Sequence, residues 1–151
     1  MKETTLCYIE NQNRYLMLHR NKKKEDINMG KWIGIGGKLE KGETPTECVQ
    51  REIMEETSLE VSELKYRGVV NFISDIYDDE LMHLFTAETK SDKFSLCNEG
   101  ELKWIDKKDI LALNLWEGDK VFLDYLLKDK KEFFKLSLIY QGEKLKRVVE
   151  E

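Results

Sequence analysis

The sequence is poor in cysteine, in proline and in long apolar runs. Its three cysteines lie far apart and form no Cys-x-x-Cys pair, so we expect neither a disulfide framework nor a structural zinc site. The apolar runs are too short to cross a bilayer, and the first residues lack the apolar segment of a secretory signal. A single proline and nine glycines leave no linker-like tract. These absences predict a cytoplasmic protein of one domain, residues 1–151, with reduced and mostly buried thiols and no membrane partner.

Positive charge is also in deficit. The chain has 25 Lys and Arg against 30 Asp and Glu, which gives a net charge of −5. Such a chain is poorly suited to bind the phosphate backbone of a duplex, so we expect no stable nucleic-acid complex. A small anion held by a local basic patch or by a metal ion remains compatible with this charge. The oligomeric state, monomer or homodimer, is left open by the sequence.

The pattern of apolar residues and turns predicts an α/β layered domain with a mixed sheet. The clearest helix spans 45–57, where Thr44 is a natural N-cap, Pro45 the first helical residue and Glu47 the partner in a capping box. Shorter helices are expected at 107–113 and 119–128. Strands are expected at 4–10, 14–20, 66–76, 80–89 and 102–105, and in a terminal hairpin of 133–140 and 144–149.

The stretch that carries chemistry joins a glycine-rich turn to the helix at 45–57. It is no P-loop, because Leu39 and not Ser or Thr follows the lysine of the turn. Along the helix, Glu52, Glu55 and Glu56 fall within an arc of about 100° that borders the buried face. Partly buried like charges repel strongly, and a divalent cation removes that cost. An all-carboxylate set favours Mg²⁺, with Mn²⁺ as a substitute, over zinc. The simpler alternative is a solvated acidic helix face.

The spacing of Gly37, Glu43, Arg51-Glu52, Glu55-Glu56 and Leu59 resembles the Nudix box, Gly-x5-Glu-x7-Arg-Glu-U-x-Glu-Glu-x-Gly-U, where U is aliphatic. At 10% for each fixed position, a chance match has odds of roughly one in ten thousand. The segments 31–38, 98–100, 116–119 and 133–142 extend the resemblance to the mutator-type, MutT/MutX-like branch, which includes 8-oxo-dGTP diphosphatases.

One position departs from the box. Ser58 stands where the motif has glycine, a residue that ends such a helix in the left-handed conformation. Serine in that conformation costs on the order of 1 kcal/mol. We therefore expect a changed helix exit with activity retained, since this position is not a ligand.

The resemblance implies a Nudix-type α/β/α sandwich with a mixed β-sheet, in which water attacks a phosphorus of a nucleoside diphosphate linked to another group. It implies that Arg51 orients the glutamates, although a surface pair with Glu55 is a simpler role. The implied metal ligands are Glu52, Glu55, Glu56, the carbonyl of Gly36, and Glu99, which alternatively accepts a proton from water.

The resemblance also implies the phosphate contacts. Lys38 follows the glycine turn and is expected at the pyrophosphate leaving group. Lys23 and Arg20 are expected at the outer phosphates. The alternative for the basic run around Lys23 is a solvated loop.

For the base, the resemblance implies that Trp116 stacks on a purine and Asp119 accepts a hydrogen bond from it. The alternative is a core role for Trp116 and a helix N-cap role for Asp119. Phe72 and Met82 are expected to line the same pocket, although such strand residues are more often core. Ile33 stands where the mammalian enzyme has an asparagine, so a preference for the oxidised base is left open.

The function expected from these residues is Mg²⁺-dependent hydrolysis of a nucleoside triphosphate to the monophosphate and pyrophosphate, with 8-oxo-dGTP as the leading substrate and sanitation of the nucleotide pool as its purpose. A second hypothesis is a Nudix hydrolase of ADP-ribose, a dinucleoside polyphosphate or the 5′ end of RNA. A third is a non-catalytic nucleotide sensor, which the retained carboxylates Glu52, Glu55, Glu56 and Glu99 disfavour.

Overall fold

The computed structural model of the chain describes residues 1–22 and 27–151. Its strands are β1 (Lys2–Asn11), β2 (Arg14–His19), β3 (Trp32–Ile33), β4 (Ser62–Ser74), β5 (Glu80–Glu88), β6 (Glu101–Asp106), β7 (Phe134–Gln141) and β8 (Lys144–Glu150). Its helices are α1 (Pro45–Thr57), the 3₁₀ helix η1 (Lys107–Ala112) and α2 (Glu117–Leu127).

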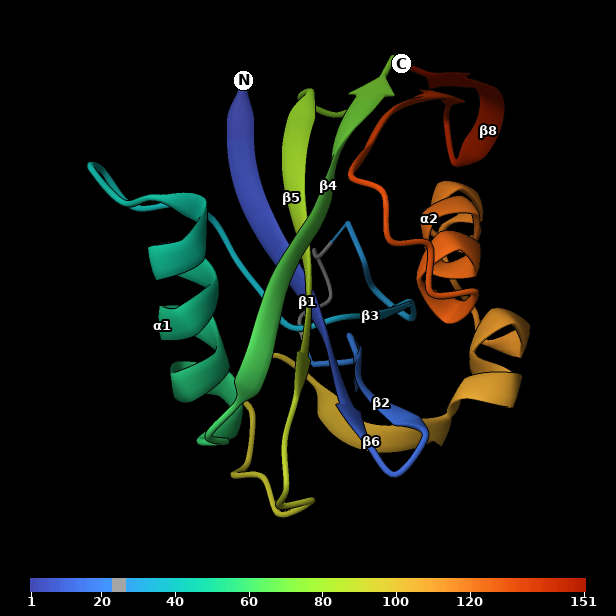
Figure 1. Cartoon of the computed structure of the whole chain (residues 1–151). Coiled ribbons are helices and arrows are strands. Elements are labelled where there is room, and N and C mark those ends of the chain that lie inside the picture. The colour runs from blue at the N-terminus through green and yellow to red at the C-terminus, as the bar shows by residue number, and fades with distance from the viewer. Residues whose placement is uncertain (23–26) are drawn as a thin grey trace.

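These strands form one mixed sheet. Their order is β3-β2-β1-β5-β4-β7-β8, and β6 pairs with β2 beside this path. The pairs β1–β5 and β4–β7 are parallel, whereas the hairpins β1–β2, β4–β5 and β7–β8 are antiparallel. Helix α1 lies against one face of the sheet and α2 against the other (Figure 1). The expected α/β sandwich with a mixed sheet is therefore confirmed.

Strand β1 explains why helices cover both faces. Successive side chains of a strand point to opposite faces, and here both sets are apolar. Leu6 and Tyr8 pack in the core under α2, whereas Cys7 and Ile9 pack in the core under α1. A central strand buried on both faces fixes the register of its neighbours, and so fixes which residues meet at the edge of the sheet.

Helix α1 begins and ends at the residues that the sequence predicts. Thr44 accepts a hydrogen bond from the Glu47 N–H, and the Glu47 side chain accepts one from the Thr44 N–H. At the other end, Ser58 keeps the left-handed conformation with φ 58°. Its N–H donates to the Met54 carbonyl at 3.1 Å. The expected change of helix exit is therefore wrong, because serine adopts the conformation that glycine favours.

Several element predictions need correction. The helix expected at 107–113 is the 3₁₀ helix η1, and α2 begins at Glu117, with Trp116 and not Asp119 at the N-cap position. Strand β4 begins earlier than expected, at an exposed stretch where Glu63 has φ 52° and the register shifts. Strand β3 was not expected, because two residues next to glycines carry no readable alternation.

The three cysteines are free and buried, as expected. His83 is buried, and His19 stacks on Trp32 with a centroid distance of 4.5 Å. Across residues 1–22 and 27–151, no helix is both long enough and apolar enough to span a membrane.

Candidate active site

The glycine turn that precedes α1 lies directly against β1. A Cβ atom on Gly36 would come within 1.9 Å of the Thr5 carbonyl oxygen, which leaves no room for a side chain. A Cβ atom on Gly37 would lie 2.5 Å from Oε1 of Glu52. The Thr5 N–H donates to the Gly37 carbonyl at 2.9 Å and so ties the turn to the strand. The two glycines thus let the turn lie against β1 on one side and against a carboxylate of α1 on the other.

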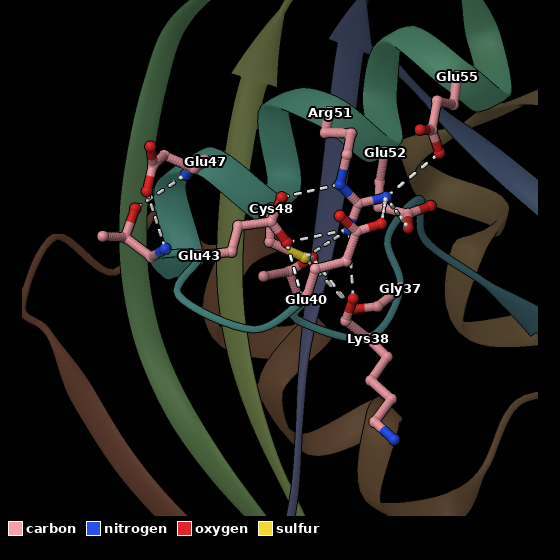
Figure 2. Close-up of polar contacts among 11 residues, drawn as sticks. Gly37, Lys38, Glu40, Glu43, Glu47, Cys48, Arg51, Glu52 and Glu55 are labelled. Carbon is pink, nitrogen blue, oxygen red and sulfur yellow. Dashed lines mark hydrogen bonds and ion pairs between the residues drawn. The ribbon is translucent and has the colours of Figure 1, made fainter.

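Arg51 lies at the centre of the polar contacts around this turn (Figure 2). Its Nε and Nη2 donate to the two carboxylate oxygens of Glu43 at 2.8 and 3.0 Å. Its Nη1 donates to Glu52 at 2.8 Å and to Glu55 at 3.2 Å, and Nη2 also donates to the Lys38 carbonyl at 3.3 Å. The orienting contact and the simpler pair with Glu55 are therefore both present.

Glu43 anchors this network to the loop. The hydrogen bonds from Arg51, followed by the backbone N–H of Glu40, lower the pKa of Glu43 to about 2. Glu43 therefore remains a carboxylate at neutral pH and keeps Arg51 in place. The motif glutamate thus braces the loop, a role that its position in the box already suggested.

Glu56 differs from its neighbours because it is buried. Burial raises its pKa first, and the hydrogen bond and charge of Glu99 raise it further. Oε2 of Glu56 has no hydrogen-bond partner among the described residues. On the far side, Arg20 Nη1 donates to Glu99 Oε2 at 3.3 Å. Glu56 thus keeps a buried, unpartnered oxygen beside the carboxyl group of Glu99, and this set of oxygen ligands fits a hard divalent cation.

The carboxylates are not already gathered as a complete cage. Within residues 1–22 and 27–151, no three His, Cys, Asp or Glu side chains form a ready-made cation site. The side chain of Glu55 is 59% exposed, whereas that of Glu52 is 14% exposed. Of the predicted carboxylate ligands, Glu52 and Glu56 are therefore shielded from solvent, the Glu99 side chain is 33% exposed, and Glu55 lies toward solvent.

A pocket of about 370 Å³ joins two groups of predicted residues. The first group is polar and comprises Arg20, Gly36, Lys38, Glu52 and Glu99, with Arg20 bonded to Glu99 and Glu52 lying against the glycine turn; we call it the polar end. The second group is largely apolar and comprises Ile33, Phe72, Met82, Trp116 and Asp119, with the rings of Phe72 and Trp116 in contact; we call it the aromatic end. Arg51, Glu55 and Glu56 do not line the pocket, and Lys23 lies outside the described residues.

Trp116 packs in the core, which is the simpler of the two roles that the sequence left open, and it also lines the pocket. It is 5% exposed, and its ring meets those of Phe72 and Tyr140 edge to face. Its indole N–H donates to Oδ1 of Asn28 at 2.7 Å, and the Lys31 ammonium lies 5.2 Å from its ring centre. The ring is therefore held rigidly by the core while it lines the pocket.

Asp119 lies in the first turn of α2 and faces the same pocket. Burial, followed by the charge of Glu80, raises its pKa to about 7, and Lys31 opposes this shift. Among the described residues none donates a hydrogen bond to this carboxyl group, so its acceptor capacity is open to a ligand.

Five further polar residues line the pocket and were not predicted from the sequence, namely Lys2, Thr4, Thr5, Asn28 and Glu80. Lys2 and Glu80 are partners in the parallel β1–β5 pair, which brings them together although they are far apart in the sequence. Nothing in the local sequence signals this pairing, because strand register is set by the burial of both faces of β1.

Comparisons with known proteins show the family of the chain. The chain matches the family described as NUDIX domain over residues 2–126. It is 30% identical over 133 residues to the uncharacterized Nudix hydrolase YvcI of Bacillus subtilis, which covers 85% of this chain and 80% of that protein. It is 31% identical over 132 residues to an oxidized purine nucleoside triphosphate hydrolase of Danio rerio, covering 86% of this chain and 82% of that protein.

A solved structure supports the fold. The crystal structure of a MutT protein from Bacillus halodurans matches with a TM-score of 0.87 at 24% identity, over 100% of this chain and 98% of that chain. At 24% identity this similarity shows the fold but not the substrate.

Proposed function

Since the chain belongs to the Nudix family, whose hydrolases act on pyrophosphate bonds, we propose that it hydrolyses purine nucleoside triphosphates to a monophosphate and pyrophosphate. In this proposal oxidised dGTP is a substrate and the reaction cleans the nucleotide pool. The similarity to an oxidized purine nucleoside triphosphate hydrolase supports this choice.

One observation carries the proposal. A single pocket of about 370 Å³ runs from carboxylates at one end to an aromatic wall at the other. Charged, polar groups at one end suit a polyphosphate with its cation, and a flat apolar wall suits a base. Both halves of a nucleotide thus find matching chemistry in the same cavity.

The residues present fit a bound Mg²⁺, which would supply the positive charge that offsets both the buried carboxylates and the phosphates. Glu52, Glu55, Glu56, Glu99 and the Gly36 carbonyl would hold it, and Mn²⁺ has the same preference for oxygen ligands. The unpartnered oxygen of Glu56 is the observation that supports this fit.

Other residues at or next to the polar end would orient the ligands, accept a proton and bind phosphate. Arg51 fixes the orientation of Glu52 by a hydrogen bond of 2.8 Å. Glu99 lines the pocket next to Glu56 and in this proposal either holds the cation or accepts the proton of the attacking water. Lys38 and Arg20 line the polar end, where their charges would hold phosphate oxygens.

The aromatic end would hold the base. The rigid ring of Trp116 offers a face for stacking, and Asp119 offers acceptor oxygens for N–H groups of the base. Ile33 lines this end and has no hydrogen-bonding side chain, so it contributes only apolar contact.

The test is product analysis after incubation with Mg²⁺ and a panel of nucleotides. The panel holds dGTP, 8-oxo-dGTP, dATP, ADP-ribose and a dinucleoside tetraphosphate. Pyrophosphate and monophosphate from the purine triphosphates are expected. Release of orthophosphate alone, or no turnover by wild-type protein, contradicts the proposal.

Two variants separate chemistry from folding in this assay. Glu56→Gln removes the charge of the buried carboxylate and should lose most turnover while its melting temperature is kept. Glu60→Gln, an exposed position just after α1, is the matched control and should leave turnover unchanged.

The same panel also tests a second candidate function, which the side chain of Ile33 suggests. Because this residue cannot hydrogen-bond an oxidised base, hydrolysis of another nucleoside diphosphate derivative is the second candidate function. Faster turnover of ADP-ribose or of the dinucleoside tetraphosphate than of any triphosphate would select that function within the same family.

A further inference from the structure

Glu80 is a second carboxylate at the aromatic end of the pocket, and its orientation is fixed. Its Oε2 accepts a hydrogen bond from the Thr4 hydroxyl at 2.7 Å, and its Oε1 lies 3.3 Å from the ammonium of Lys2. Its side chain is 21% exposed and lines the pocket. Each carboxylate oxygen can accept two hydrogen bonds, so both contacts leave acceptor capacity for a ligand.

Glu80 and Asp119 line the same pocket, although they belong to different elements. Glu80 begins β5, whereas Asp119 lies in the first turn of α2, and both line the pocket. They are close enough that the charge of Glu80 raises the pKa of Asp119. Among the described residues none donates a hydrogen bond to the Asp119 carboxyl group, whereas Glu80 keeps acceptor capacity beside its contacts with Thr4 and Lys2.

Apart from Thr4 and Lys2, which contact Glu80, the side chains at this end supply no donor to the two carboxyl groups. The indole N–H of Trp116 is already taken by Asn28 at 2.7 Å. Ile33, Phe72 and Met82 have no hydrogen-bond donor in their side chains. The wall therefore presents a flat apolar surface and two acceptor groups. Its complement is a flat ring that carries adjacent N–H donors on one edge.

We propose that Glu80 is a specificity-determining residue, which together with Asp119 accepts hydrogen bonds from a base edge where a ring N–H adjoins an exocyclic amino group, as in guanine. This inference rests on the proposed function, because it requires a nucleotide in the pocket. Thr4 and Lys2 are positioning residues in this scheme, since they hold the Glu80 carboxylate. Recognition by this edge does not depend on the oxidation state of C8.

The test compares two nucleotides that differ only in the exocyclic amino group, dGMP and dIMP. Their dissociation constants are measured by calorimetry, so the readout does not require catalysis. Wild-type protein should bind dGMP about tenfold more tightly than dIMP, the loss expected when a buried acceptor is left unpaired. Glu80→Ala should bring this ratio close to one.

Two further variants make the result specific to the Glu80 carboxylate. Glu80→Gln keeps one acceptor oxygen and should give an intermediate ratio, so the proposal stays testable if Glu80→Ala does not fold. Glu88→Ala removes an exposed carboxylate at the other end of β5, outside this pocket, and should leave the ratio at its wild-type value.

The outcomes separate this inference from the proposed function. If purine triphosphates are hydrolysed but the dGMP to dIMP ratio is unchanged in Glu80→Ala and Glu80→Gln, Glu80 does not determine specificity and the inference is wrong. If wild-type protein neither binds these nucleotides nor hydrolyses triphosphates, the proposed function itself is overturned, and the inference with it.

Discussion

Arg51 is the residue through which the loop and the helix carboxylates are held together. Its planar guanidinium donates to both oxygens of Glu43 and also to Glu52 and Glu55. A lysine ammonium carries the same charge on a single nitrogen atom and cannot reproduce the planar arrangement of guanidinium donors. The geometry of the donors, and not only the charge, therefore decides where the Glu52 carboxylate lies.

Arg51→Lys should keep the fold but lower the turnover number. Partners that orient ligating groups typically contribute about 10- to 100-fold to metal affinity or activity, and we expect a loss in this range. Steady-state kinetics and a melting curve measure the two effects separately. Arg147→Lys, at an exposed position of β8, is the matched control. A folded Arg51→Lys protein with full activity would contradict the orienting role.

Asp119 makes stability depend on pH. Its pKa is about 7 in the folded protein against an ordinary 3.8, so between these values the folded protein keeps a proton that the unfolded chain has released. The contribution of Asp119 to stability therefore falls as pH rises from about 4 to about 7 and is constant above. The groups that act on or respond to it are Glu80 of β5, Lys31, Tyr8 of β1 and Tyr140 of β7.

Asp119→Asn should remove this loss. The free energy of unfolding of the variant minus that of wild type should therefore grow by up to about 4 kcal/mol between pH 4 and pH 8. This size follows from the pKa shift of Asp119, because one pKa unit corresponds to about 1.36 kcal/mol. Urea unfolding at a series of pH values measures it. Asp124→Asn, on a more exposed turn of the same helix, is the control. A difference that stays constant with pH would show that Asp119 is not held in this environment.

At the scale of elements, the end of α1 stores strain. Ser58 adopts φ 58°, a conformation that glycine reaches without steric cost, and its hydroxyl donates to Ser95 at 3.1 Å on the exposed surface. The Ser95 N–H also donates to the Thr57 carbonyl at 2.9 Å. The helix end is thus tied to the segment that leads to Glu99.

Ser58→Gly should raise the free energy of unfolding by about 1 kcal/mol, because relief of a left-handed side chain outweighs one exposed hydrogen bond. Denaturant unfolding measures the change. Ser62→Gly, at the start of β4 where φ is ordinary, should instead lower stability by roughly 0.5–1 kcal/mol. A loss of stability in both variants would mean that the Ser58–Ser95 contact matters more than the strain.

Substitutions at Gly36 and Gly37 should have different effects, because the two glycines have different neighbours. Gly36→Ala places a Cβ 1.9 Å from a backbone oxygen of β1, which cannot yield, and should destabilise the fold by about 1–3 kcal/mol or more. Gly37→Ala instead meets the flexible end of Glu52 at 2.5 Å, so it should displace that carboxylate and lower activity at least about tenfold with little loss of stability. Unfolding and kinetic measurements on both variants test this contrast, and equal effects of both variants on stability would contradict it.

At the scale of the whole molecule, local signals could be read from the sequence and long-range ones could not. The bounds of α1 follow from its capping box, and the resemblance to the Nudix box singled out Arg51 and Glu52. The positions of Lys2 and Glu80 do not, because the parallel pairing of β1 and β5 depends on burial of the whole sheet. The 3₁₀ form of η1 could not be predicted either, because so short a helix shows no clear period in the sequence.

The pocket is likewise a property of the whole molecule. Its polar end comes from the glycine turn, α1 and Glu99, and its aromatic end from β4, β5 and α2. The chain carries a net charge of −5, so a polyphosphate would be repelled without a compensating cation. The central claim is therefore that the carboxylates of α1, together with Glu99, hold a divalent ion at the polar end.

The most direct test is a calorimetric titration with Mg²⁺ in the presence of a non-hydrolysable nucleoside triphosphate. Wild-type protein should bind Mg²⁺, Glu56→Gln should bind it at least about tenfold more weakly, and Glu60→Gln should match wild type. Absence of Mg²⁺ binding by the wild-type protein, or equal binding by Glu56→Gln, would contradict the account.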